Sequence, residues 1–114
     1  MKFRAGFVSN SSSSCFIVQT NDDVNEVVMS LESLLGFYNR FMGDKLQFED
    51  IFAQPSVATQ KDEDDWIKSG YENYYDFKGM TGKVIIFSAS DNAIPYCMED
   101  FINQRFNTQR YHLG

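Results

Sequence analysis

The sequence predicts an α/β protein, more specifically an α+β two-layer sandwich with the element order βαββαβ. Runs of β-forming apolar residues at 15–20 and 83–88 are each followed by a segment with the spacing of an amphipathic helix. A short β-forming run also ends the chain. This order is typical of a ferredoxin-like fold, here with an insertion at about 53–82. The 114 residues are expected to form a single domain, 1–114.

The first strand and the first helix have the clearest patterns. Residues 15–20 read Cys-Phe-Ile-Val-Gln-Thr, and this nearly continuous apolar run predicts a central strand. We expect Asn21 or Asp22 to cap a helix that Gly43 ends in a left-handed conformation. The apolar positions of this helix recur every three or four residues, at Val24, Val27, Val28, Leu31, Leu34, Leu35, Tyr38, Phe41 and Met42.

The middle of the chain has weaker patterns. Residues 45–52 fit a short strand or, over their second half, a helical turn, and Pro55 is expected to end either one. The sequence then predicts a loop at 56–61, a helix at 62–76 and a turn at 78–82. These segments supply the predicted insertion.

The last third of the chain predicts a buried strand, a helix and a final strand. The strand covers 83–88, Asp91 or Asn92 caps the helix, and Pro95 lies in its first turn. The final strand is expected at 109–113. The apolar face of the helix is predicted to contain Ile94, Met98, Phe101, Ile102 and Phe106.

The composition is acidic, with a formal net charge of −6 at pH 7. An acidic domain repels phosphate backbones, so direct nucleic-acid binding is not expected. The negative charge favours binding to a basic protein surface, including a surface that itself binds nucleic acid. The alternative is that the charge only keeps the protein soluble. No apolar run reaches the length of a membrane span, so no membrane contact is expected.

Cys15 and Cys97 are the two cysteines of the chain. Neither belongs to a pair with metal-ligand spacing, and polar serines interrupt the apolar segment that a secretory signal requires. We therefore expect two reduced, mostly buried thiols in a cytosolic protein, with no metal and no cofactor.

A serine-rich run at 11–14 precedes the first strand. In a βαββαβ sheet the last strand lies antiparallel beside the first, so this run is expected near Tyr111, His112 and Gly114. A serine nucleophile needs a base within hydrogen-bond reach, and His112 is the only histidine. The carboxylate of Asp91 or Asp100 is available to orient the His112 imidazole. The candidates for catalysis are Ser11, Ser12, Ser13 and His112.

The same residues also fit a structural corner, in which hydroxyls and the imidazole bond backbone groups where strands end. We favour this interpretation because no nucleophile-elbow motif or defined oxyanion donor accompanies the serines. An anion-binding nest near Gly6, Lys2 and Arg4 is a further alternative, although the lysine and spacing of a P-loop are missing. The predicted corner comprises Gly6, Ser9, Asn10, Ser14, Arg110 and His112.

Acidic and aromatic residues concentrate at 62–77. Tyrosine and tryptophan are favoured at interfaces, and acidic neighbours suit a basic partner. The alternative is that these aromatics pack the insertion onto the sheet. Consecutive carboxylates diverge around a helix axis, so they predict solvated charge rather than a metal site. The residues predicted to contact a partner are Asp62, Glu63, Asp64, Asp65, Trp66, Tyr71, Tyr74 and Tyr75.

Both ends of the chain resemble small, mostly uncharacterised proteins of tailed phages and prophages. Their amino-terminal signature is similar to Gly6-Phe-Val-Ser-Asn-Ser-Ser-Ser-Ser14 followed by Phe16-Ile-Val18. Their ending is similar to Lys83-Val-Ile-Ile-Phe-Ser-Ala-Ser-Asp-Asn-Ala-Ile-Pro95 and to the terminal Arg110-Tyr-His-Leu-Gly114. Cys15 departs from the pattern, which often continues with serine. The resemblance implies a phage gene whose product works in the host bacterial cytoplasm or is packaged in the virion.

We therefore expect a non-enzymatic, acidic accessory protein that binds a host protein or defence complex and inhibits or redirects it. Two alternatives stay open. One is a virion or assembly component, and the other is a small hydrolase or transferase that uses the serine loop and His112. The sequence makes no prediction of the oligomeric state.

Overall fold

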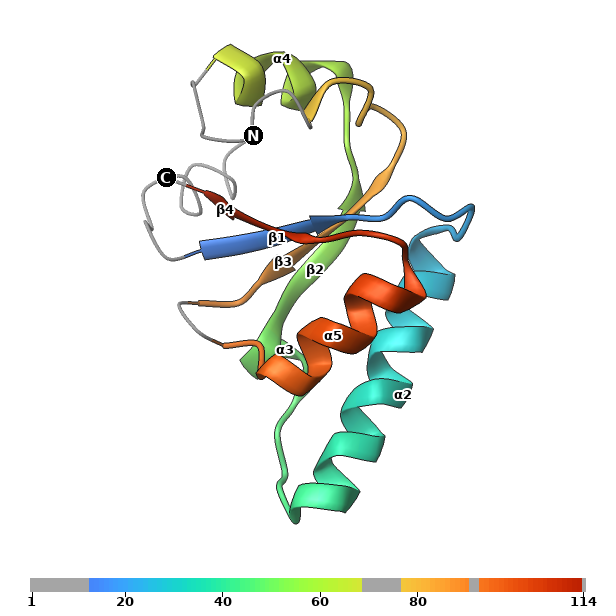
Figure 1. Ribbon diagram of the computed structural model, residues 1–114, viewed down its shortest axis with the longest axis vertical. Helices are drawn as coiled ribbons and strands as arrows, with labels where there is room; N and C mark the ends of the chain where they lie inside the picture. The colour runs from blue at the N-terminus through green and yellow to red at the C-terminus, as the bar shows by residue number, and fades with distance from the viewer. Residues whose placement is uncertain (1–12, 69–76, 91–92, 114) are drawn as a thin grey trace.

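The computed structural model describes residues 13–68, 77–90 and 93–113, and Figure 1 shows their arrangement. The elements are β1 (Ser13–Ile17), α2 (Val24–Met42), α3 (Phe48–Ile51), β2 (Phe52–Val57), α4 (Gln60–Lys68), β3 (Val84–Ser88), α5 (Tyr96–Arg105) and β4 (Arg110–Leu113). The strands form one antiparallel sheet in the order β2-β3-β1-β4. The α+β class is confirmed. β1 is central, as the sequence predicts, and the buried strand β3 lies beside it.

α2 and α5 pack on one face of the sheet and enclose the main core. Phe16 of β1 and Ile86 of β3 share this core with Leu31 of α2 and Ile102 of α5, and all four side chains are fully buried. Burial of these large apolar groups is the main source of stability for this layer. The two helices therefore hold a fixed position over the sheet.

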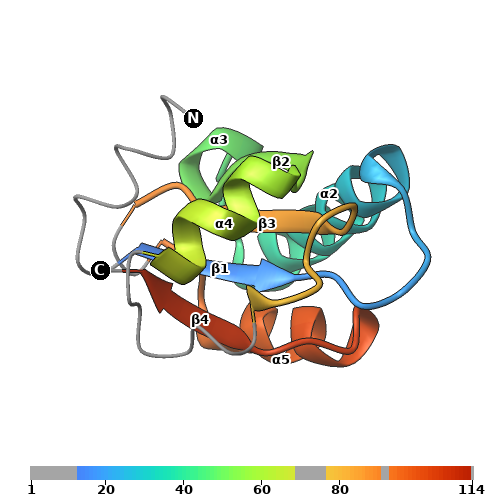
Figure 2. The same cartoon turned by 90° about the horizontal axis from the view of Figure 1, so that it is seen from above.

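α4 and the turn at 77–80 cover the opposite face of the sheet, and Figure 2 shows α4 from above. Ile17 of β1 and Phe87 of β3 point to this side, where they form a second core with Trp66 of α4. Because both faces of the central strands are covered, β3 is buried at every position. This explains why the central strands have continuous rather than alternating apolar sequences.

Pro55 does not end the second strand, contrary to the prediction. It lies within β2, at the edge of the sheet, where a missing backbone N–H is tolerated. The pairing of β2 with β3 shifts register between Ala53 and Ser56, on either side of the proline. The preceding helical turn, one of two alternatives for 45–52, is present as α3. The inserted material therefore begins after β2, at 58 rather than at about 53.

α2 has a capping signal at each end. Asp23 is its N-cap, rather than the expected Asn21 or Asp22. The Asp23 carboxylate accepts the Glu26 N–H at 2.9 Å, and the Glu26 carboxylate accepts the Asp23 N–H at 3.0 Å, which completes a capping box. Gly43 ends the helix with a φ of 67°, as predicted.

The other helices begin at positions that differ from the prediction. α5 starts after Pro95, which is its N-cap residue. The caps predicted for it, Asp91 and Asn92, lie outside the described residues. α4 begins earlier than predicted, at Gln60, and the remainder of the helix expected there, 69–76, also lies outside the described residues.

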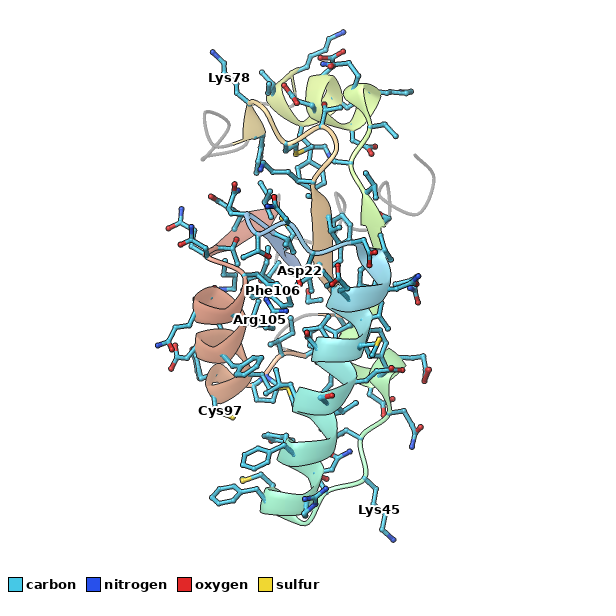
Figure 3. All side chains as sticks on the ribbon, turned by 90° about the vertical axis from the view of Figure 1, so that its right-hand side faces the viewer. Asp22, Lys45, Lys78, Cys97, Arg105 and Phe106 are labelled. Carbon is cyan, nitrogen blue, oxygen red and sulfur yellow. The ribbon has the colours of Figure 1, made fainter. Side chains whose placement is uncertain are left out.

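Asp22 ties the start of α2 to the end of α5. Arg105 donates two hydrogen bonds to its carboxylate, from Nη1 to Oδ2 at 3.0 Å and from Nη2 to Oδ1 at 2.9 Å. Thr20 donates a third. These bonds, with that from Arg105 the largest cause, lower the pKa of Asp22 from 3.8 to about 2. Figure 3 shows Asp22 and Arg105 close together where the two helices meet.

We expect the Asp22→Asn variant to lose an acid-dependent part of the stability. The folded-state pKa of Asp22 lies below its unfolded value, so the carboxylate stabilises the fold fully above about pH 4. This contribution is lost as the pH falls through about 2. Between about pH 5 and pH 2, the free energy of unfolding should fall by about 1 kcal/mol more in the wild type than in the variant. The difference is expected to be this small because solvent screens the partly exposed pair of Asp22 and Arg105. Urea denaturation over a pH series measures the difference, and parallel declines would contradict it.

Candidate functional site

The register of β1 and β4 brings the end of the serine run beside the end of the chain. Ser14 pairs with His112, and Ser13 pairs with Leu113. The Ser14 N–H donates a hydrogen bond to the Ser88 hydroxyl at 3.0 Å, and both of these serines are buried. The Ser88 hydroxyl therefore satisfies a buried backbone N–H of β1, which is a structural role.

The remaining residues of the predicted corner fall into two groups. Arg110 of β4 forms an ion pair with Glu99 of α5, with 3.1 Å between Nε and Oε1, and so links the last strand to the preceding helix. The catalytic and anion-binding interpretations stay predictions because they depend on residues outside the described ranges. The catalytic candidates Ser11 and Ser12 lie there, as do Lys2, Arg4 and Gly6 of the anion-binding alternative. The corner residues Ser9 and Asn10 also lie outside the described ranges.

The first two carboxylates of the predicted acidic cluster bond to neighbouring loops. Asp62 accepts the Thr59 N–H at 2.9 Å and is only 4 % exposed. Glu63 accepts hydrogen bonds from the Thr81 N–H at 3.0 Å and from the Thr81 hydroxyl at 2.7 Å. The hydroxyl bond is the largest cause that lowers the pKa of Glu63. Asp62 is thus a structural residue rather than a surface contact.

The next two carboxylates pair along their own helix. Asp64 accepts a hydrogen bond from Gln60 at 3.0 Å, and Asp65 lies 2.9 Å from the Lys61 ammonium. The Lys61 hydrogen bond lowers the pKa of Asp65. The four carboxylates of the cluster thus face four different partners. Within the described residues, no three His, Cys, Asp or Glu side chains gather as metal ligands.

Trp66 is a core residue, which corrects its assignment to a partner surface. Its side chain is 2 % exposed, and its ring meets the rings of Phe77 and Phe87 edge-on, with centroids 5.1 and 5.9 Å away. This is the alternative in which an aromatic residue packs the insertion onto the sheet. The other aromatic residues predicted to contact a partner lie outside the described residues, and they are Tyr71, Tyr74 and Tyr75.

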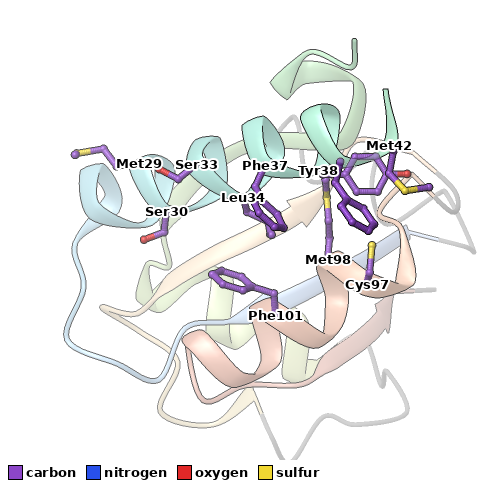
Figure 4. Close-up of a pocket in the computed structure, with 11 residues that line it drawn as sticks. Met29, Ser30, Ser33, Leu34, Phe37, Tyr38, Met42, Cys97, Met98 and Phe101 are labelled. Carbon is purple, nitrogen blue, oxygen red and sulfur yellow. The ribbon is translucent and has the colours of Figure 1, made fainter. Parts of the chain in front are cut away.

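The candidate site that the structure supports best is a groove between α2 and α5, which the sequence analysis did not predict. We call it the α2–α5 groove. Its volume is about 930 Å³, and its walls are mainly apolar and aromatic (Figure 4). Its lining residues are Met29, Ser30, Ser33, Leu34, Phe37, Tyr38, Phe41, Met42, Cys97, Met98 and Phe101.

The α2–α5 groove exposes large apolar side chains. Phe41 is 79 % exposed, Phe37 and Met29 are each 65 % exposed, and Phe101 on the α5 wall is 42 % exposed. Phe37 and Phe41 lie one helical turn apart, and their rings stack with centroids 6.3 Å apart. Cys97 is also exposed, contrary to the prediction, because it lies on the groove side of α5 rather than against the sheet.

Phe41 and Met42 are exposed because α2 extends past the sheet that it covers (Figure 1). Leu35 is the last buried residue of the helix. The returning loop is fixed to the extension by Asn39, whose side chain donates to the Leu46 carbonyl at 2.9 Å and accepts the Leu46 N–H at 3.1 Å. Phe41 and Met42 therefore belong to the apolar series of α2 without joining the core.

The lining of the groove suits the binding of an apolar surface. Among the described residues that line it, Tyr38 and Cys97 alone are titratable, so the lining lacks the paired acid and base that proton-transfer chemistry requires. Ser30 and Ser33 add hydroxyl groups to otherwise apolar walls. Contiguous exposed apolar surface of this kind marks sites of interaction with other molecules.

Among the helices that the structure describes, none is both long enough and apolar enough to cross a membrane. Comparisons with protein-family models, with curated proteins and with solved structures find no match to this chain. The α2–α5 groove is thus assigned as the candidate site on its geometry and its exposed side chains.

Proposed function

We propose that the protein is a non-enzymatic binding protein that holds an apolar segment of another protein in the α2–α5 groove. The observation that carries this proposal is the exposure of Phe37, Phe41 and Phe101 along one groove. Aromatic residues are enriched among the side chains that dominate binding energy at protein interfaces. Leaving them in water is unfavourable, so contact with an apolar partner gains free energy.

The open shape of the groove favours a protein segment over a small molecule. Small-molecule sites usually enclose most of the ligand surface, whereas Phe41 is 79 % exposed at one end of this groove. Two neighbouring helices present ridges between which a third helix can pack. An amphipathic helix with apolar side chains at every third or fourth position matches such a groove.

We propose a host protein as the partner and inhibition or redirection of that protein as the outcome. The terminal motifs resemble those of phage proteins, which supports a role in the cytoplasm of an infected bacterium. The net charge of −6 favours a partner that carries basic residues beside its apolar segment. Asp64 is exposed on α4, on the opposite face of the sheet from the groove, and it stays a proposed partner contact separate from the groove.

Affinity capture from host bacterial cells tests this proposal with three forms of the protein. The wild type should retain a stoichiometric partner, and Phe41→Ser should bind it about thirtyfold more weakly, as expected for the loss of an aromatic contact that contributes strongly to binding. Tyr96→Ser is the matched control, because Tyr96 is 80 % exposed but does not line the groove. Equal capture by all three forms, or no partner for the wild type, would count against the proposal.

A further inference from the structure

The side of α2 that faces away from the sheet carries a surface that shares Met29, Ser33 and Phe37 with the rim of the groove, and we call it the outer face of α2. It consists of Glu26, Met29, Ser33, Phe37 and Arg40, and spacings of three, four and seven place these residues on one side of a helix. All five are exposed. Figure 3 shows α2 along the side of the molecule that faces the viewer, where no other described element covers it.

We propose that the outer face of α2 binds the same face of a second copy of this chain, with the two helices antiparallel and Ser33 at the two-fold axis. This inference goes beyond the proposed function, because it names a symmetric partner and rests on charged residues that do not line the groove. A two-fold interface uses the same patch on both copies, so the patch must be complementary to itself. The sequence of α2 meets this requirement.

The residues on either side of Ser33 are matched in charge and in size. Glu26 precedes Ser33 by seven residues and Arg40 follows it by seven, so antiparallel pairing places the acid of each copy level with the base of the other. Met29 lies four residues before Ser33, and Phe37 lies four residues after it. Antiparallel pairing therefore places Met29 of each copy level with Phe37 of the other. The two-fold pairing therefore brings complementary groups together at both ends and in the middle.

Arg40 and Glu26 have capacity for these contacts. Arg40 forms no ion pair within the described ranges, and its side chain is exposed. One Glu26 carboxylate oxygen accepts the N–H of Asp23 in the capping box, at 3.0 Å. A carboxylate has acceptor sites for more than one donor. At a rise of 1.5 Å per residue, each charged pair lies on the order of 10 Å from the two-fold axis.

The centre of the outer face has small residues. Gly36 follows Ser33 by three residues and Ser30 precedes it by three, so glycine of one copy lies level with serine of the other. Glycine is disfavoured in a helix interior, and a Cβ built on Gly36 would meet nothing within 4 Å in this chain. Contacts within the described chain therefore do not require the glycine. A second helix that approaches closely at this point would require small residues.

The outer face of α2 also offers exposed apolar area to a second copy. A fully exposed phenylalanine or methionine offers about 200 Å², and the exposed fractions of Met29 and Phe37 on the outer face then amount to about 260 Å² per copy. A standard interface buries about 800 Å² per partner, of which about 65 % is apolar in homodimers. The outer face thus supplies about half of the apolar area that a standard two-fold dimer buries, so the dimer is expected to form at high protein concentration.

Charge reversal followed by mixing tests the pairing. Glu26→Lys and Arg40→Glu each place like charges together in a homodimer, so each variant alone should dimerise at least about tenfold more weakly than the wild type. When the two variants are mixed, the Glu26→Lys position of one chain lies level with the Arg40→Glu position of the other. At the opposite end of the interface, the unchanged Glu26 and Arg40 lie level with each other. The mixture should therefore form a heterodimer with nearly wild-type affinity.

Sedimentation velocity across a concentration series measures the association, with circular dichroism to confirm that each variant is folded. The wild type should reach twice the chain mass of 13.2 kDa at high protein concentration. A wild type that stays monomeric, or a mixture that associates no better than the separate variants, would overturn the proposal. In either case the capture experiment with Phe41→Ser still decides the proposed function, because Phe41 lies beyond the paired span from Glu26 to Arg40.

Discussion

Trp66→Ala is expected to lower the free energy of unfolding by about 3–5 kcal/mol, the range for a buried tryptophan that leaves a cavity. The side chain is 2 % exposed and packs edge-on against Phe77 and Phe87. It also holds α4 on the sheet, so its removal affects the whole second core. Urea denaturation followed by far-ultraviolet circular dichroism measures the loss, because the variant contains no tryptophan for fluorescence.

Two further variants separate burial from aromatic character. Tyr96→Ala removes an aromatic side chain that is 80 % exposed, so the free energy of unfolding should change by no more than about 0.5 kcal/mol. Trp66→Phe should cost less than Trp66→Ala, since the indole N–H has no hydrogen-bond partner in the described part of the chain and only volume is lost. If Trp66→Ala unfolds at the wild-type urea concentration, Trp66 is not a core residue and its interpretation as a partner contact returns.

The elements that the sequence predicts well are those whose burial imposes a pattern. β1 and β3 are covered on both faces, so their sequences are continuously apolar, and α2 repeats apolar residues because one side of it meets the sheet. β2 was misplaced because Pro55 normally ends regular structure. At the edge of a sheet, beside a register shift, the proline disrupts nothing, and only the fold supplies this context.

The α2–α5 groove was missed for a related reason. Apolar periodicity identifies the side of a helix that avoids water, but it does not indicate where the covering sheet ends. Phe41 continues the apolar series of α2, but it lies past the sheet and is exposed. Length was the available signal: α2 has 19 residues, or about 28 Å, whereas β1 and β3 have five residues each, or about 17 Å.

The second large effect is expected at Leu31, whose replacement by alanine should lower the free energy of unfolding by about 2–5 kcal/mol. Leu31 is fully buried between α2 and the sheet, in the same core as Phe16 and Ile86. The matched control is Met29→Ala, two residues earlier in the same helix, where the side chain is 65 % exposed. At low protein concentration its effect on the free energy of unfolding should stay within about 0.5 kcal/mol.

Urea denaturation of both variants, at a concentration where the chain is monomeric, provides the comparison. A dimer adds stability that depends on protein concentration, so a Met29→Ala defect that appears only at high concentration reports lost association. A large defect at low concentration would instead show that Met29 supports the monomer fold. If Leu31→Ala alone destabilises the monomer, α2 has one face for the core and another for partners. Loss of capture by Phe41→Ser, or of pairing by Arg40→Glu, then identifies a lost contact rather than a lost fold.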